Sequence, residues 1–252
     1  MSDYKGVGLT DDNVLPEQEA ICILSRRERR RIETRDRLFE AATRLLSERD
    51  FDSVTVEMIT EAADVGKGTF FNYFANKEGI VAYYFEYTSQ FIGKTFQQQM
   101  ELLTQLQQNS ASPEEIREAW DEICWKCLMD MVRQIAEFDS RSRRFARTLL
   151  ALCQTNETVR KESLRVKEQM LESAVELMRL EQSLGLVRSD YSPDVIARFL
   201  RNVYFSTLTE WAQRDDDMNL VESLDINFVL ARSAIRPTPQ RSAAEHHGRE
   251  DT

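Results

Sequence analysis

The stretch TVEMITEAADVGKGTFFNYF, residues 55–74, decides the fold of this chain. Thr55 is a favourable N-cap for a short helix, and Asp64-Val65-Gly66 breaks the helical pattern that follows it. A second short helix, rich in aromatic residues, is expected from Lys67 onward. Two short helices joined by a tight turn are the smallest unit that holds a recognition helix in a DNA major groove. The sequence therefore predicts a helix-turn-helix motif over residues 55–74.

The start of the second short helix carries side chains that suit nucleic acid. Lys67 and Thr69 lie at the positive end of this helix, where free backbone N–H groups point towards phosphate. Gly68 allows the backbone to approach closely, and Asn72 has the amide that pairs well with adenine. The alternative is a packed helical corner with no role in DNA binding. The polar pattern Lys67-Gly68-Thr69-x-x-Asn72 offers little to a protein core, and we therefore favour the DNA-binding interpretation.

A basic cluster precedes the motif. Residues 26–37 contain seven arginines and three acidic residues, although the whole chain has a formal net charge of −10. Such a run is often the solvated start of a helix. It can also lie along phosphates, where each arginine contact releases counterions. Because the run leads directly into the motif, we expect the second role and name Arg29 and Arg30 as candidate DNA contacts.

Residues 55–78 follow the helix-turn-helix signature of the TetR family of bacterial transcriptional regulators almost throughout, and the resemblance extends over about residues 28–90. It implies a homodimer that binds double-stranded operator DNA with palindromic sequence, acts as a repressor, and is released by an unknown small-molecule effector. It also implies phosphate contacts for Thr55 and Lys77 and a backbone contact for Tyr73. The candidate DNA-binding residues are Arg29, Arg30, Thr55, Lys67, Gly68, Thr69, Phe71, Asn72, Tyr73 and Lys77.

Three positions depart from the commonest form of the signature. Asp64 stands where a turn glycine is usual, and Asp tolerates the left-handed conformation better than most residues. Gly66 replaces the usual serine cap, at a cost of about a few tenths of a kcal/mol. Phe71 lacks the hydroxyl of the usual tyrosine. None of these changes breaks the motif.

The composition favours an all-α fold. Only 8 glycines and 5 prolines occur in 252 residues, fewer than strand-and-turn folds need at their corners. Hydrophobic periodicity and cap residues predict about nine helices, three short ones in an N-terminal head and longer ones behind. The expected helices are 26–48, 56–63, 67–74, 78–107, 113–138, 143–153, 156–184, 193–213 and 220–235.

The expected organisation has two folded parts and two flexible ends. Residues 1–25 form a leader, 26–78 the DNA-binding domain, 79–236 the ligand-binding and dimerisation domain, and 237–252 a disordered tail. The resemblance implies that residues 193–213 and 220–235 pair in a four-helix bundle of the homodimer. Two heads about 34 Å apart can then read successive major grooves. The helix at 78–107 joins the head to the larger part and is expected to carry the effector's influence to the head.

Several functional classes are excluded or disfavoured. No apolar run reaches the roughly 18 residues of a membrane span, and the acidic first 25 residues do not form a secretory signal, which predicts a cytoplasmic protein. Both histidines, His246 and His247, lie in the polar tail, so we expect neither catalysis nor metal binding through a core histidine. No phosphate loop or nucleophile–base pair is present. We therefore predict no enzyme activity, no cofactor and no metal.

An effector pocket is the hardest feature to place. Large and soft side chains in the middle helices provide candidate walls for an apolar ligand. The alternative for each of them is ordinary core packing. The candidates are Phe91, Trp120, Cys124, Trp125, Cys127 and Met131.

Cys124 and Cys127 form a C-x-x-C pair in the middle of a predicted helix. A thioredoxin-like site would place this pair at a helix start after a strand, and a zinc site would need two further ligands. We interpret both as core cysteines. For the chain as a whole, a helical protein-interaction module without sequence-specific DNA binding remains the alternative function, which the acidic remainder of the chain favours slightly.

Overall fold

The computed structural model describes residues 25–237, and within this range every regular element is a helix. Almost all of the predicted leader and tail lies outside the described residues. The elements are α2 (Arg26–Glu48), the 3-10 turn η1 (Phe51–Ser53), α3 (Val56–Ala62), α4 (Lys67–Phe71), α5 (Lys77–Gln108), α6 (Pro113–Ala119), the π-helical turn η2 (Trp120–Cys124), α7 (Trp125–Ser140), α8 (Arg143–Thr155), α9 (Glu157–Ser183), α10 (Pro193–Gln213) and α11 (Leu220–Ile235).

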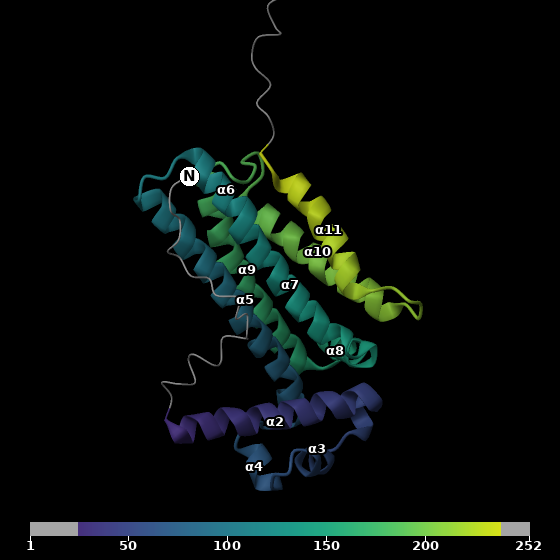
Figure 1. Cartoon of the computed structure of the whole chain (residues 1–252). Coiled ribbons are helices and arrows are strands. Elements are labelled where there is room, and N and C mark those ends of the chain that lie inside the picture. Colours follow the sequence, from purple (N-terminus) through teal and green to yellow (C-terminus); the bar gives the residue numbers. More distant parts are fainter. Residues whose placement is uncertain (1–24, 238–252) are drawn as a thin grey trace, which may run out of the picture.

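The helices form a small head below a larger bundle (Figure 1). Helix α2 runs crosswise beneath the bundle, with α3 and α4 on its far side. Helix α5 leaves the head and rises through the bundle beside α9, with which it packs extensively. Helices α10 and α11 pack against each other on the opposite side, and α7 lies between them and α5. The predicted all-α class is confirmed.

Local sequence signals explain where the helices begin. Ser25 accepts a hydrogen bond from the Glu28 amide while the Glu28 carboxylate accepts one from Ser25 N–H, which forms a capping box. Ser112 and Glu115 form a second box, with Pro113 in the first turn of α6. These paired bonds satisfy backbone donors that a helix start otherwise leaves unpaired. The helix starts predicted at residues 26 and 113 are therefore confirmed.

The segment 113–140 is one continuous rod that contains a π-helical turn, η2, between α6 and α7. The sequence predicted a single helix over 113–138 and gave no sign of this turn. When the rod is counted once, the described residues form nine helices, as predicted. Helix α4 is shorter than expected, because Asn72 is its C-cap and its amide bonds to Thr69 with the tighter i to i−3 spacing.

Two apolar clusters form the core of the described residues. The bundle cluster includes Trp120, Trp125 and Trp211. The head cluster is built on the fully buried Leu38, Ile59 and Phe70, and it continues through the start of α5 into α8 and α9. The head therefore shares its apolar core with bundle helices, and α8 packs directly on α2. A rigid connection of this kind can carry movement between the two parts.

Candidate DNA-binding head and effector cavity

The turn between α3 and α4 has the geometry that the sequence predicts. The Thr55 hydroxyl accepts a hydrogen bond from the Met58 amide at 3.2 Å and caps α3. Asp64 has a φ of 52°, the left-handed conformation in which the usual signature has glycine. Phe70 is fully buried, with its ring centroid 5.7 Å from that of Phe74. Burial of this pair fixes which side of α4 faces away from the protein.

The outward side of α4 carries most of the predicted recognition residues. Lys67, Gly68, Phe71 and Asn72 are exposed, whereas Thr69 and Tyr73 are half-buried. Phe71 is 51% exposed, a high fraction for an aromatic side chain. Exposed aromatic and polar groups of this kind indicate an interaction surface. We call these six residues the recognition surface.

A Cβ atom added to Gly68 would meet no heavy atom within 4 Å. Within the described protein, nothing therefore requires glycine at this position. A glycine in the first turn of a helix lowers the helix stability relative to alanine. Its presence is consistent with a partner outside the chain that approaches the backbone closely.

The two predicted lysines already make contacts inside the head. Lys67 forms an exposed ion pair with Glu57 on α3. The Lys77 ammonium donates hydrogen bonds to the carbonyls of Phe51 and Val54, the latter at 2.9 Å, and lies 4.1 Å from the centre of the Phe51 ring. Lys77 therefore fastens the first turn of α5 to η1. Its phosphate contact stays a prediction. Such a contact would use the third N–H donor of the ammonium, or Lys77 would exchange one of its carbonyl partners for a phosphate oxygen.

Arg29 and Arg30 lie exposed in the first turns of α2. Within residues 25–237, no arginine of the run 26–31 forms an ion pair with a carboxylate. Their charges are therefore available to a polyanion.

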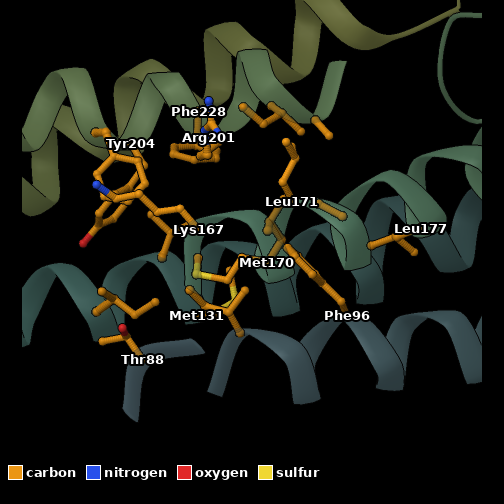
Figure 2. Close-up of a pocket in the computed structure, with 18 of the residues that line it drawn as sticks. Thr88, Phe96, Met131, Lys167, Met170, Leu171, Leu177, Arg201, Tyr204 and Phe228 are labelled. Atoms are coloured by element: carbon orange, nitrogen blue, oxygen red, sulfur yellow. The ribbon is translucent and has the colours of Figure 1, made fainter. Parts of the chain in front are cut away.

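A cavity of about 160 Å³ lies in the bundle between α5, α7, α9, α10 and α11. Figure 2 shows side chains from all five helices converging on it, among them Thr88, Met131, Leu177, Tyr204 and Phe228. Most of the lining is aliphatic, aromatic or sulfur-containing. The cavity therefore suits a mainly apolar molecule.

Four of the predicted pocket residues line the cavity, namely Trp120, Cys124, Trp125 and Met131. Phe91 and Cys127, also predicted, do not line it. Each lies one residue before a lining side chain, Ile92 or Leu128, and is therefore rotated by about 100° around its helix. Phe91 instead packs at the edge of the bundle core, and Cys127 is half-buried.

A buried carboxyl group joins three helices at the end of the cavity nearest the head. Asp139 on α7 accepts hydrogen bonds from the hydroxyls of Tyr84 on α5, at 2.5 Å, and Tyr204 on α10, at 2.8 Å. Burial raises the pKa of Asp139 to about 6, although both hydrogen bonds act to lower it. Both tyrosines line the cavity, and burial raises their pKa values well above the ordinary range.

A second buried carboxyl group lies at the other end. Glu181 on α9 is 3% exposed, and one of its oxygens accepts a hydrogen bond from the Trp120 indole N–H at 2.7 Å. Burial raises the pKa of Glu181 to about 7, against the lowering effect of that bond. Gln99 on α5 is 4% exposed and also lines the cavity.

Two cations, Lys167 on α9 and Arg201 on α10, complete the polar part of the lining. Both are half-buried, and the Lys167 ammonium lies 4.8 Å from the centre of the Phe205 ring. Figure 2 places Lys167 beside Tyr204, on the side of the cavity opposite Leu177.

The cysteine pair has the chemistry of core residues. Burial raises the pKa of Cys124 to about 12, and the pKa of Cys127 is also raised by burial. Both thiols, like that of Cys153, are unbridged. A raised pKa lowers the thiolate fraction and hence the reactivity. Nowhere between residues 25 and 237 do three or more His, Cys, Asp or Glu side chains gather where they could hold a metal ion.

The sequence analysis missed the polar groups of the cavity. Glu181 and Gln99 follow apolar residues on the buried faces of α9 and α5, for example Leu177 and Met178 one turn before Glu181. A charged or amide side chain at an apolar position of a helical repeat was the available signal. Asp139 carried a weaker signal, because it stands in the last turn of its helix, where a polar residue does not interrupt the apolar repeat.

An apolar face remains exposed on the outside of α10 and α11. Val229 and Leu230 on α11 are 58% and 64% exposed, and Val195 and Phe199 on α10 are 48% and 41% exposed. Ile226 on α11 is 56% exposed. Exposed apolar residues that gather on two neighbouring helices indicate a surface covered by a partner. We call these five residues the apolar face.

No described helix is both long enough and apolar enough to cross a bilayer.

Comparison with known proteins finds a family model that matches the head and a relative that matches most of the chain. The family model for bacterial regulatory proteins of the tetR family matches residues 38–84. A relative, the HTH-type transcriptional repressor DhaR of Mycobacterium sp. (strain GP1), is 26% identical over 171 residues, which are 68% of this chain and 78% of that protein.

Solved structures share the whole fold. A TetR-family regulator from Mesorhizobium loti aligns with a TM-score of 0.58 and 17% identity over 81% of this chain and 96% of that chain. The fatty acid degradation regulator FadR of Bacillus halodurans aligns with a TM-score of 0.57 and 22% identity over 80% of this chain and 99% of that chain. The arrangement of head and bundle is therefore a known one.

Proposed function

Because this chain belongs to the TetR family of bacterial regulatory proteins, we propose that it binds a palindromic operator as a homodimer, represses transcription there, and leaves the DNA when a small molecule occupies its cavity. The main support for this proposal is that α4 has one buried side and one exposed side. Phe70 is fully buried, whereas Lys67, Gly68, Phe71 and Asn72 face outward. A five-residue helix with this division presents its polar start to an external surface, as a recognition helix must.

The apolar face on α10 and α11 supports the homodimer. A single head reads only a few base pairs, whereas two heads related by a twofold axis read two half-sites about 34 Å apart. Interfaces of homodimers are rich in apolar side chains, as this face is. We propose that two copies of the face pack together and set the spacing of the heads.

The cavity supports regulation by a mainly apolar effector. Regulator FadR of Bacillus subtilis, which shares the fold with a TM-score of 0.55 and 19% identity, was crystallised in complex with stearoyl-CoA. DhaR, the relative from Mycobacterium, is named a repressor, and we propose the same sign of regulation for this chain. The aliphatic and aromatic lining is consistent with an elongated apolar effector.

The proposed switch is a shift between two arrangements of the heads. Helix α5 both lines the cavity and enters the head core, and Asp139 ties it to α7 and α10. An effector that binds one arrangement more tightly changes the population of heads spaced for successive grooves. Helix α8 gives a second connection, because Arg144 pairs with Asp50 of the head at 2.7 Å while Arg147 binds the end of α10.

The proposed role has consequences for where the protein acts and for whether it catalyses a reaction. We propose that the protein acts in the cytoplasm, where bacterial DNA lies, and we assign no reaction to the cavity. Glu181 lines the cavity and is bonded to the Trp120 indole, whereas Asp139 lies behind the lining residues Tyr84 and Tyr204, which donate to it. Neither therefore forms the paired acid and base that hydrolytic catalysis uses.

Selection of DNA from a random pool tests the proposal. Purified full-length protein should enrich a palindrome whose half-sites are centred about 10 base pairs apart. The variant Asn72→Ala should enrich the same palindrome with relaxed preference at one position, and Gln97→Ala, an exposed change on α5, should behave as wild type. Failure to enrich any sequence would contradict the proposal and favour a protein-interaction module.

A further inference from the structure

Two buried polar atoms in the wall of the cavity lack a hydrogen-bond partner within the described chain. They are Nε2 of Gln99 and Oε2 of Glu181, on side chains that are 4% and 3% exposed. Leaving a buried donor or acceptor unpaired destabilises the folded protein. Retaining one of each in a mainly apolar cavity indicates that both meet a partner that the protein itself does not supply.

The two atoms belong to the same end of the cavity. Helix α5 and the α6–α7 rod are antiparallel neighbours, and the bond between Tyr84 and Asp139 fixes their register near the head. Gln99 lies about 22 Å beyond Tyr84 along α5, and Trp120 about 28 Å from Asp139 along the rod. Glu181 is bonded to Trp120, so it lies within about one helical turn of the level of Gln99.

Among residues 25–237, no lysine or arginine forms an ion pair with Glu181, and burial and the Trp120 bond are what shift its pKa. On the α6–α7 rod, Trp120 occupies the other carboxyl oxygen, and the neighbouring Cys124 is an unionised thiol. On α11, the Arg232 guanidinium lies 5.6 Å from the centre of the Trp120 ring and pairs with Asp121. This end of the cavity is therefore lined by two side chains that each hold a buried atom without a partner, the acceptor Glu181 Oε2 and the donor Gln99 Nε2.

We propose that this end of the cavity binds a hydroxyl group of the effector, which donates its proton to Glu181 Oε2 and accepts a hydrogen bond from Gln99 Nε2. The inference rests on the proposed function and names the chemical class of the effector, an alcohol with an elongated apolar chain. A hydroxyl is both donor and acceptor, so it satisfies both atoms. An alkylammonium has only donors and leaves Gln99 unpaired. At pH 8, where Glu181 with its pKa of about 7 is mainly ionised, a carboxylate has only acceptors and leaves Glu181 Oε2 without a donor.

Calorimetric binding of two isomers to the full chain at pH 8 tests the proposal without DNA. The probes are 1-decanol and 1-methoxynonane, which have the same atoms and nearly the same shape. The ether oxygen accepts but cannot donate. We expect 1-decanol to bind about tenfold more tightly, the factor that one hydrogen bond of about 1.4 kcal/mol provides. Equal binding of the two isomers, or no binding of either, would overturn the proposal.

Two nearly isosteric variants test each partner separately. In Glu181→Gln, the amide oxygen keeps the bond from Trp120, and an NH2 donor replaces the acceptor Oε2. In Gln99→Met, the donor is removed at similar volume. Each should weaken 1-decanol binding about tenfold, and Glu181→Gln should also abolish the preference over the ether. Cys127→Ala, on the same rod but outside the cavity lining, should bind both probes as wild type does.

The outcomes separate the two proposals. Each variant is first compared with wild type by thermal unfolding, so that loss of fold is not mistaken for loss of a contact. An unchanged preference for the alcohol in both variants would overturn the hydroxyl site, whatever the DNA result. Tight, alcohol-selective binding by a chain that binds no operator would support the site and contradict the proposed function.

Discussion

Tyr84 donates a hydrogen bond of 2.5 Å to the carboxyl group of Asp139. This bond joins α5, the helix that leaves the head, to the end of α7 in the bundle. The second oxygen of Asp139 is taken by Tyr204 on α10, one of the two helices that carry the apolar face. One buried carboxyl group thus ties the head connector to the proposed dimer helix. Any movement of α10 relative to α5 must stretch or break this pair of bonds.

Removing one of these bonds should destabilise the fold. Tyr204→Phe leaves the ring in place and deletes the donor to a buried carboxyl group, a bond worth about 1.5–3 kcal/mol. Urea denaturation should show that loss, whereas Tyr191→Phe, at a residue 52% exposed, should change the stability by less than about 0.5 kcal/mol. Equal stability of Tyr204→Phe and wild type would show that the bond contributes nothing.

Glu181 should make the stability depend on pH. Its pKa is about 7 in the folded chain, against an ordinary value of 4.5, so the folded state binds the proton more tightly than the unfolded state does. Stability must then fall as pH rises from about 4.5 to 7. Urea denaturation at pH 5 and pH 8 should show that Glu181→Gln gains stability relative to wild type on going to pH 8. A difference between the two proteins that is independent of pH would contradict the raised pKa.

Gly68→Ala should separate folding from DNA binding. No atom within 4 Å opposes the added methyl group, and alanine is the better helix former. The variant should be as stable as wild type or more stable, by up to about 1 kcal/mol. If the backbone of Gly68 approaches phosphate, the same methyl group should weaken operator binding at least tenfold. Unchanged affinity would mean that α4 does not approach the DNA at this residue.

The apolar face should control the oligomeric state. Leu230→Lys places a charge in the centre of the proposed interface between two copies of α11, which should shift the dimer to monomer in analytical ultracentrifugation. Leu164→Lys is the matched control, since Leu164 is 57% exposed on α9 and lies outside the face. If both variants sediment as wild type does, another surface forms the dimer.

The helices were largely predictable, because the signals that set them are local. Ser25, Ser112, Asn76 and Asn156 cap the helices that follow them, as their residue types suggest. The exposed side of α4 also followed from sequence, because the polar pattern Lys67-Gly68-Thr69-x-x-Asn72 offers little to a protein core. Local signals failed at η2, where the π turn depends on packing and not on a distinctive residue.

The polar ends of the cavity could not be predicted, because they depend on which helices meet. Glu181 and Trp120 are far apart in sequence and are joined only in the folded bundle. Asp139 gains its two tyrosine partners in the same way. Lys77 likewise gains two carbonyl partners inside the head that sequence could not reveal, and its phosphate contact stays a prediction.

The most direct test of the central claim is equilibrium binding of the purified protein to DNA from upstream of its own gene, over a salt series with unrelated DNA as control. We predict selective binding, with log K falling against log salt at a slope of about −5 or steeper, since two heads should together contact at least about six phosphates. Asn72→Ala should lose about 1–3 kcal/mol of that selectivity. Equal, weak binding to both DNAs, unaffected by Asn72→Ala, would contradict the account.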